Sequence, residues 1–188
     1  MIVGDTNTFA IESEITLAYE RLGQLALGFF VIHVMGRCYG VREPDATMLA
    51  NSFDEVGKRI ARRGSHTPSF PMDANADEIA YAFRRTVYGK CEEGELFFGL
   101  SVRQFTDSID SNCLAWAPDG DEAFDDHSYV LQFEDGNEVR LVAFKGTPDF
   151  LYDPTSLNDV RLSQDEFYGI LQEWHGRFKD EWGSLPKA

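Results

Sequence analysis

The spacing of hydrophobic residues near the start of the chain predicts a series of β-strands. In residues 9–15 the apolar side chains fall on one side and two glutamates on the other, which is the period of a half-buried strand. Residues 27–35 are apolar on both sides, as is typical of a central strand. The dipeptide Met35-Gly36 then predicts a turn into a partner strand over residues 37–41.

Three amphipathic segments predict helices. The first begins at Pro44-Asp45, with Asp45 as its N-cap, and ends at Gly64. The second spans Asp77–Tyr88, and the third follows the capping-box pattern of Ser163 and Glu166. Each carries apolar residues at helical spacing on one face: Leu49, Phe53, Val56 and Ile60; Ile79, Phe83 and Val87; Phe167, Leu171, Trp174 and Phe178.

Hairpin signals decide the fold class. Asp135-Gly136 between two β-rich runs predicts a hairpin of residues 128–134 and 138–144. Shorter strands are expected at Leu96–Val102, Cys113–Ala117 and residues 160–162. Consecutive hairpins with segregated helices favour an α+β fold. We therefore expect a single domain over residues 1–188, with a mainly antiparallel β-sheet and about three packed helices.

Composition places this domain among soluble proteins. The chain has 188 residues, 43% of them hydrophobic and 13% aromatic, which is enough for a sizeable core without disulfides. The three cysteines, Cys38, Cys91 and Cys113, are widely spaced and form no zinc pattern, so we expect reduced thiols. No signal peptide and no apolar run of membrane-spanning length is present, which predicts a cytoplasmic protein with no membrane partner.

Charge changes this picture by pointing to a partner. The formal net charge is −15. Residues 1–94 hold 10 basic and 13 acidic side chains, a balance of −3, whereas residues 95–188 hold 7 and 19, a balance of −12. An acidic field of this kind repels nucleic acid and attracts cationic partners. Solubility alone is the competing explanation of the charge.

Catalytic motifs are missing from the sequence. It contains no GxSxG, no P-loop, no HExxH and no GxGxxG, and we expect no cofactor and no bound metal. The four histidines are isolated from one another, and His33, inside the most apolar strand, is interpreted as a core residue. The basic run of residues 58–63 lies at a predicted helix end, where positive charge complements the helix dipole, and this reading is favoured over a nucleic-acid patch.

A dense group of acidic residues follows residue 106. The group and the aromatic residue within it are Asp107, Asp110, Asp119, Asp121, Glu122, Phe124, Asp125 and Asp126. A calcium loop starting at Asp119 would need a ligand at position 5 and Glu at position 12, but these positions hold Ala123 and Val130. Clustered carboxylates instead suit the Arg and Lys side chains of a partner, with Phe124 as an aromatic anchor. The alternative is a solvated loop whose aromatic side chains lie in the core.

The first third of the chain resembles a known family. The blocks that carry the resemblance are Ile2-Val-Gly-Asp5, Phe9-Ala-Ile-Glu-Ser-Glu-Ile15, Gly28-Phe-Phe-Val-Ile-His-Val34, Gly36-Arg-Cys-Tyr-Gly-Val-Arg-Glu-Pro-Asp-Ala-Thr47, Ser52-Phe-Asp-Glu-Val56 and Arg62-Arg-Gly64. In order and spacing they are similar to immunity protein family 42 of bacterial polymorphic toxin systems. The resemblance covers about residues 1–66.

The resemblance implies a cytoplasmic inhibitor rather than an enzyme. Its partner would be a cognate toxin domain, often the C-terminal domain of a secreted contact-dependent inhibition effector. Many such toxins are nucleases with basic, phosphate-binding sites, and an acidic inhibitor complements them. The matched blocks are expected to form the scaffold, namely core strands, a turn and one face of a helix. The toxin contact is therefore expected elsewhere, at Asp107, Asp110 and the loop of residues 119–126. Two alternatives stay open: a small intracellular hydrolase or metal-dependent enzyme that uses the carboxylates of residues 107–126, and a scaffold or regulator with another protein partner.

Overall fold

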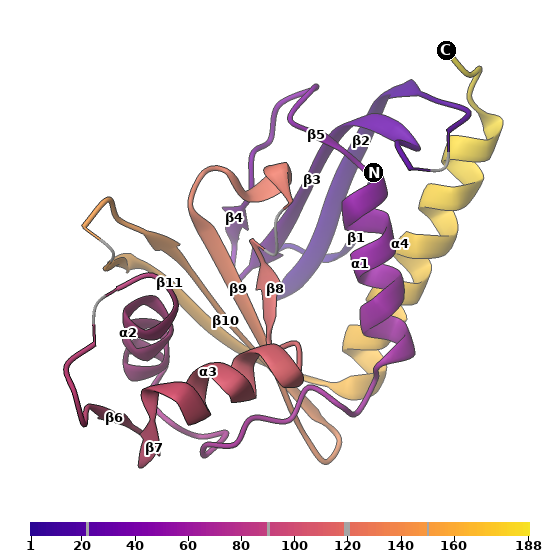
Figure 1. Cartoon of the computed structure of the whole chain (residues 1–188). Coiled ribbons are helices and arrows are strands. Elements are labelled where there is room, and N and C mark those ends of the chain that lie inside the picture. Colours follow the sequence, from indigo (N-terminus) through magenta and orange to yellow (C-terminus); the bar gives the residue numbers. More distant parts are fainter. Residues whose placement is uncertain (22, 90, 119–120, 150) are drawn as a thin grey trace.

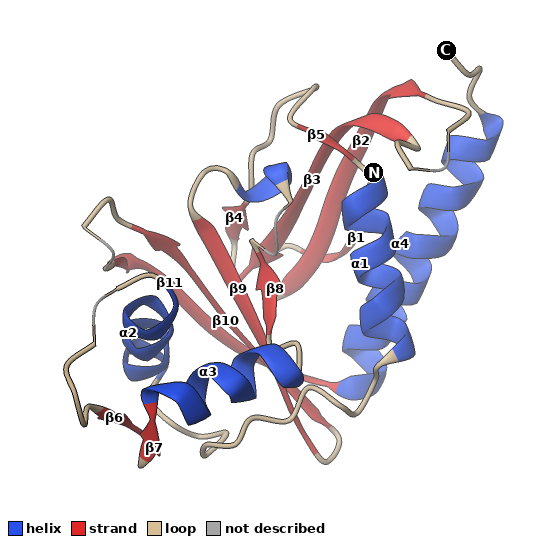
Figure 2. Ribbon diagram, viewed as in Figure 1, coloured by secondary structure: helices blue, strands red, loops and turns tan. Residues whose placement is uncertain are grey.

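Two antiparallel sheets form the framework of the protein (Figures 1 and 2). The structure is a computed structural model, which describes residues 1–188 except 22, 90, 119–120 and 150. The first sheet has the order β1 (Ile2–Asp5), β2 (Phe9–Ala18), β3 (Ala26–Val34), β4 (Arg37–Tyr39), and β5 (Thr47–Met48) also pairs with β3. The second sheet has the order β11 (Tyr152–Ser163), β10 (Glu138–Gly146), β9 (Ser128–Asp135), β8 (Ala115–Ala117).

The helices divide between the two sheets. Helices α1 (Ala50–Ala61) and α4 (Gln164–Ser184) pack together beside the first sheet, and α4 also contacts β10 and β11 of the second; α2 (Ala76–Val87) and α3 (Val102–Ser111) cover the opposite face of the second sheet. The hairpin of β6 (Leu96–Phe97) and β7 (Leu100–Ser101) joins α2 to α3, and a 3₁₀ turn, Glu122–Phe124, joins β8 to β9. The α+β class is therefore correct, but the described residues form four α-helices rather than about three. None of these helices has the length and apolar character needed to cross a membrane.

The second sheet is buried on both faces. Along β9, Val130 packs with the first sheet, α1 and α4, whereas Leu131 and Phe133 pack with α2 and α3. This alternation follows from the two-residue period of a strand. The central strands β9 and β10 therefore connect two hydrophobic clusters.

Several predicted elements are present. The turn between β3 and β4 has positive φ at both Met35 (51°) and Gly36 (78°), as a type I′ hairpin requires. The β9–β10 hairpin turns at Gly136 and Asn137. The predicted apolar residues of the last helix, Phe167, Leu171, Trp174 and Phe178, are all buried.

One predicted helix start and one predicted strand were wrong. The first helix begins at Ala50 and not at Asp45, because Thr47 and Met48 pair with Gly28 and Leu27 at the edge of the first sheet. The predicted strand over residues 96–102 is instead the β6–β7 hairpin followed by α3. Ser101 begins that helix with a complete capping box, in which its hydroxyl accepts from the Gln104 N–H and the Gln104 side chain accepts from the Ser101 N–H.

Candidate functional site

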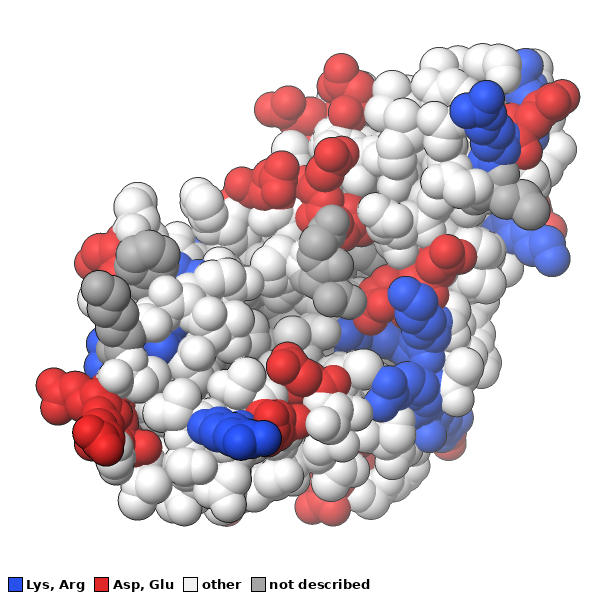
Figure 3. All heavy atoms as spheres, viewed as in Figure 1, with Lys and Arg blue, Asp and Glu red and all other residues white. Residues whose placement is uncertain are grey.

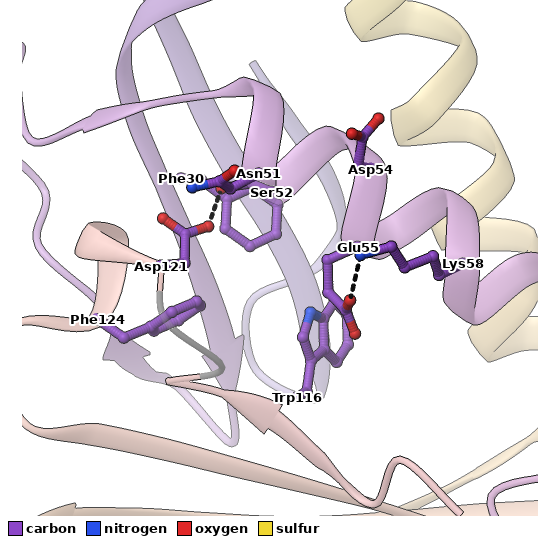
Figure 4. Close-up of a pocket in the computed structure, with 9 residues that line it drawn as sticks. All are labelled: Phe30, Asn51, Ser52, Asp54, Glu55, Lys58, Trp116, Asp121 and Phe124. Atoms are coloured by element: carbon purple, nitrogen blue, oxygen red, sulfur yellow. Dashed lines mark hydrogen bonds and ion pairs between the residues drawn. The ribbon is translucent and has the colours of Figure 1, made fainter. Parts of the chain in front are cut away.

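The acidic segment, residues 121–126 between β8 and β9, is bound to the rest of the protein through Asp121 (Figure 4). The hydroxyl of Thr47 donates to one of its carboxylate oxygens over 2.9 Å. The hydroxyl of Ser52 donates to the other over 2.5 Å, as Figure 4 shows. The N–H of Ala123 donates to the same carboxylate over 2.9 Å, so Asp121 is also the N-cap of the 3₁₀ turn. Asp121 therefore holds the acidic segment against β5 and the first turn of α1.

Asp126 fixes the other end of this segment. It accepts from the Ser128 N–H over 3.1 Å and forms an ion pair of 2.7 Å with Lys145 on β10. The Val41 N–H donates to the Ala123 carbonyl over 2.7 Å, and the Gly40 N–H donates to the Ser128 hydroxyl over 3.0 Å. Two of the predicted partner-binding carboxylates are thus engaged within the protein.

The aromatic side chains near this segment lie in the core. Phe124 is 3% exposed and packs edge-on against Phe30, with ring centroids 6.2 Å apart. Trp116 and Tyr129 are also buried. Phe124 is therefore not an exposed anchor in this structure. Its position matches the alternative prediction, a loop whose aromatic side chains lie in the core.

Exposed carboxylates remain at two places. Glu122 and Asp125 are exposed on the loop, and Asp107 and Asp110 are exposed on α3. Asp107 has Arg103 at 3.6 Å, one helical turn away. Asp119, which the sequence also suggested, lies outside the described residues.

A polar cleft of about 240 Å³ separates α1 from the 3₁₀ turn (Figure 4). Its lining residues are Phe30, Asn51, Ser52, Asp54, Glu55, Lys58, Trp116, Asp121 and Phe124. Glu55 lies 3.7 Å from Lys58 and 3.0 Å from Arg59, which is 1% exposed at its side chain. Lys58 and Arg59 of the basic run thus pair with an acidic neighbour on their own helix, whereas Arg63 pairs with Asp165 on α4. Asp107 lines a different hollow, on α3, so Asp107 and Asp121 do not share one site.

The histidines take separate structural positions. His33, expected in the core, is partly buried, and its Nε2 lies 2.9 Å from Glu12. Burial alone would raise the pKa of Glu12, but hydrogen bonds from Arg42 and His33 outweigh it and lower the pKa below its usual value. His175 stacks on Phe53, with ring centroids 3.9 Å apart. Within the described ranges, no three His, Cys, Asp or Glu side chains are grouped so that they could hold a metal ion.

Sequence reasoning missed a groove between α2 and the β6–β7 hairpin. It has a volume of about 640 Å³. Its lining residues are Asp77, Glu78, Tyr81, Glu95, Leu96, Phe97, Phe98 and Tyr152. The available signal was Tyr81, an aromatic residue that lies off the apolar stripe of α2 and is 41% exposed.

Comparison with known proteins decides the family. The sequence model of the family described as immunity protein 42 matches residues 1–177. The chain belongs to this family. The resemblance noted over residues 1–66 is thereby confirmed, and the match continues into α4. The protein is an immunity protein, a class that neutralises a toxin.

A solved structure supports the same fold. The crystal structure of CdiI from Burkholderia dolosa AUO158 is similar to this immunity protein with a TM-score of 0.54 over 94% of this chain and 99% of that chain. The two sequences are 14% identical, so the likeness concerns the fold. The search of curated proteins found no match.

Proposed function

We propose that this immunity protein acts in the cytoplasm as a non-enzymatic inhibitor that binds its cognate toxin domain directly. Membership of the immunity protein 42 family over residues 1–177 carries the proposal. The polar cleft beside α1 supports binding rather than chemistry, because both oxygens of its Asp121 are occupied by hydroxyl donors. The partner is the C-terminal toxin domain of a secreted effector.

Charge supports a basic toxin, such as a nuclease. The protein carries −15 overall, and −12 of this lies in residues 95–188. Acidic side chains are prominent around the acidic segment and near β6 in the face shown in Figure 3, whereas basic ones gather over α1. A nuclease site holds phosphate with Arg and Lys, and carboxylates pair with the same groups, bidentately with Arg.

The exposed carboxylates of the acidic segment and α3 are our proposed contacts. Glu122, Asp125, Asp107 and Asp110 are free of the core and accessible to a partner. Asp121, Phe124 and Asp126 have a supporting role, because their internal contacts hold the loop in place. Asp119 belongs to the same proposed surface by sequence.

Co-expression tests this function. A toxin domain from a secreted-effector gene found next to the gene for this protein is induced in a heterologous host, with or without the immunity protein. We expect growth to be rescued and a stable complex to co-purify. An unrelated toxin of the same reaction class is the control and should not be neutralised. Substrate turnover by the purified immunity protein, or rescue without any complex, would contradict direct inhibition.

A further inference from the structure

Exposed apolar side chains concentrate at one end of the protein. Eight large hydrophobic residues among the described ones are exposed, and five of them lie on or beside α2, β6 and the start of β11: Tyr81, Val87, Tyr88, Leu96 and Leu151. Leu96 is the most exposed of all, at 62%. Of these five, Tyr81 and Leu96 line the groove. Exposed apolar side chains at a groove mark an interaction site more often than single ones scattered over a surface.

The groove at this end is built from well-packed parts. Phe98 and Gly99 form the turn of the β6–β7 hairpin with φ of 55° and 78°, and Phe98 stacks on Phe70 with ring centroids 5.0 Å apart. The opposite wall is tied to the second sheet, because the Tyr152 hydroxyl donates to Asp77 over 2.6 Å. The groove therefore exists before any partner arrives, which lowers the entropic cost of binding.

The groove has acidic side chains at its rim, and Arg84 and Arg85 of α2 are engaged internally. Arg103, beyond the hairpin, is exposed and pairs with Asp107 at 3.6 Å. Asp77 and Glu78 are exposed on α2 and line the groove, whereas the exposed Glu92 and Glu93 line a neighbouring hollow that shares Glu95 and Leu96 with it. Arg84 is buried and donates to the Leu151 carbonyl over 2.9 Å. Arg85 pairs with Glu95 at 3.2 Å. An occupant that matches this surface carries positive charge beside an apolar group.

We propose that this groove is the apolar anchor site for a basic segment of the toxin, with an Arg or Lys side chain beside a large hydrophobic one. The inference rests on the proposed function and supplies what the acidic segment lacks. Binding hot spots are buried aromatic or Arg anchors in preformed pockets, surrounded by polar contacts. The aromatic residues near the acidic segment lie in the core, whereas Tyr81 and Leu96 are exposed. A second copy of this chain is disfavoured as occupant, because it carries the same net charge of −15.

Exposed-residue variants test the groove. The probe is the toxin domain that the co-expression test identifies as cognate, in a catalytically inactive form, and its dissociation constant is measured by biolayer interferometry. Leu96→Lys and Glu78→Lys should each weaken binding about tenfold, and the double variant about a hundredfold. The matched controls are Leu17→Lys on β2 and Asp180→Lys on α4, which change exposed residues of the same type outside the groove. These should bind within about twofold of the parent, and all variants should keep the parent melting temperature to within about 3 °C.

The outcomes separate this inference from the proposed function. Failure of the parent protein to bind the toxin overturns both. Tight binding by the parent with unchanged binding by both groove variants overturns the groove alone. A dimer of the immunity protein that Leu96→Lys dissociates, seen by light scattering, assigns the groove to a second copy and also overturns it. A photo-reactive p-benzoylphenylalanine in place of Tyr81 should crosslink to a toxin peptide that contains Arg or Lys, and the same group in place of Leu17 should not.

Discussion

At the scale of single residues, the core contains a connected set of buried polar side chains. The hydroxyl of Tyr168 on α4 donates to Glu134 on β9, which also accepts from the backbone N–H of His66 over 3.2 Å. Arg59 on α1 donates to Gln132 over 3.0 Å and to the Ala115 carbonyl over 2.6 Å. Because every member that loses its partner in a dry interior costs free energy, such a set specifies one arrangement of α1, α4 and the second sheet.

His66 makes this set sensitive to pH. Burial and the neighbouring Arg59 lower the pKa of His66 below its ordinary value, although Glu134 acts in the opposite direction. Below about pH 6.5 the unfolded chain therefore binds a proton that the folded protein does not. The free energy of unfolding should fall as pH drops through 6.5, and the loss should level off only below the lowered pKa of the folded state. We expect a lower urea midpoint at pH 5.5 than at pH 7.5.

The variant His66→Asn isolates this contribution. Its amide can replace the Nδ1–H that lies 3.1 Å from the carbonyls of Asn112 and Cys113, but it does not titrate. The pH dependence should be shallower than in the parent. His127→Asn is the control, since His127 is exposed and has φ of 63°, a conformation that Asn tolerates. An equal pH dependence in the parent and in His66→Asn would assign it to other groups, such as His175, whose pKa is lowered by burial.

At the scale of elements, Asp121 was predicted from the sequence to be an exposed partner contact, but in the fold it connects three elements. It joins β5, α1 and the 3₁₀ turn through three hydrogen bonds. Asp121→Ala should lower the free energy of unfolding by about 2 kcal/mol, because charged acceptors and N-caps contribute that order of stability. Asp125→Ala, at an exposed position, should change it by less than about 0.5 kcal/mol. Urea unfolding measures both, and equal stability of the two variants would contradict the clamping role.

The same distinction governs how binding data should be interpreted. A loss of toxin affinity in Asp121→Ala or Asp126→Ala can arise from a displaced loop, whereas a loss in Asp125→Ala or Glu122→Ala reports a direct contact. Lys58→Ala on α1 is the control variant. Lys58 is exposed and lines the same cleft as Asp121, but its ammonium group repels the Arg and Lys side chains of a basic toxin, so its removal should not weaken binding.

Elements with strong local signals could be predicted, and elements decided by tertiary contacts could not. The β9–β10 hairpin and α4 follow from a two-residue turn and from apolar residues at helical spacing. The start of α1 could not be found in this way, because the pairing of Thr47 with Gly28 across the sheet overrides the helical signal at Asp45. The α3 helix had a readable signal in the Ser101–Gln104 capping box, and the apolar run before it obscured that signal.

At the scale of the whole molecule, the sequence determines net charge but does not reveal which side chains stay exposed. The excess of carboxylates in residues 95–188 could be counted directly, whereas the burial of Phe124 and the exposure of Leu96 depend on tertiary packing. The groove is formed by α2 and a hairpin that follows it, and its lining also includes Tyr152 from β11. Residues far apart in the chain meet there only after folding.

Net charge should act mainly on the rate of association with a basic toxin. Attraction at long range raises the association rate constant toward the order of 10⁸ M⁻¹s⁻¹ at low salt, against about 10⁵–10⁶ M⁻¹s⁻¹ for neutral partners. Raising the ionic strength from about 0.01 to about 0.15 M shortens the Debye length from about 30 to about 8 Å, so this rate constant should fall while the dissociation rate constant changes little.

Stopped-flow association at a series of salt concentrations measures this effect. Neutralising the exposed carboxylates Glu122 and Asp125 together should reduce the salt dependence, because these groups contribute to the long-range field. Leu96→Lys on the groove should act differently, since the loss of an apolar anchor raises the dissociation rate constant at every salt concentration. An association rate constant that does not vary with salt would mean that the charge of −15 serves solubility and does not steer the toxin.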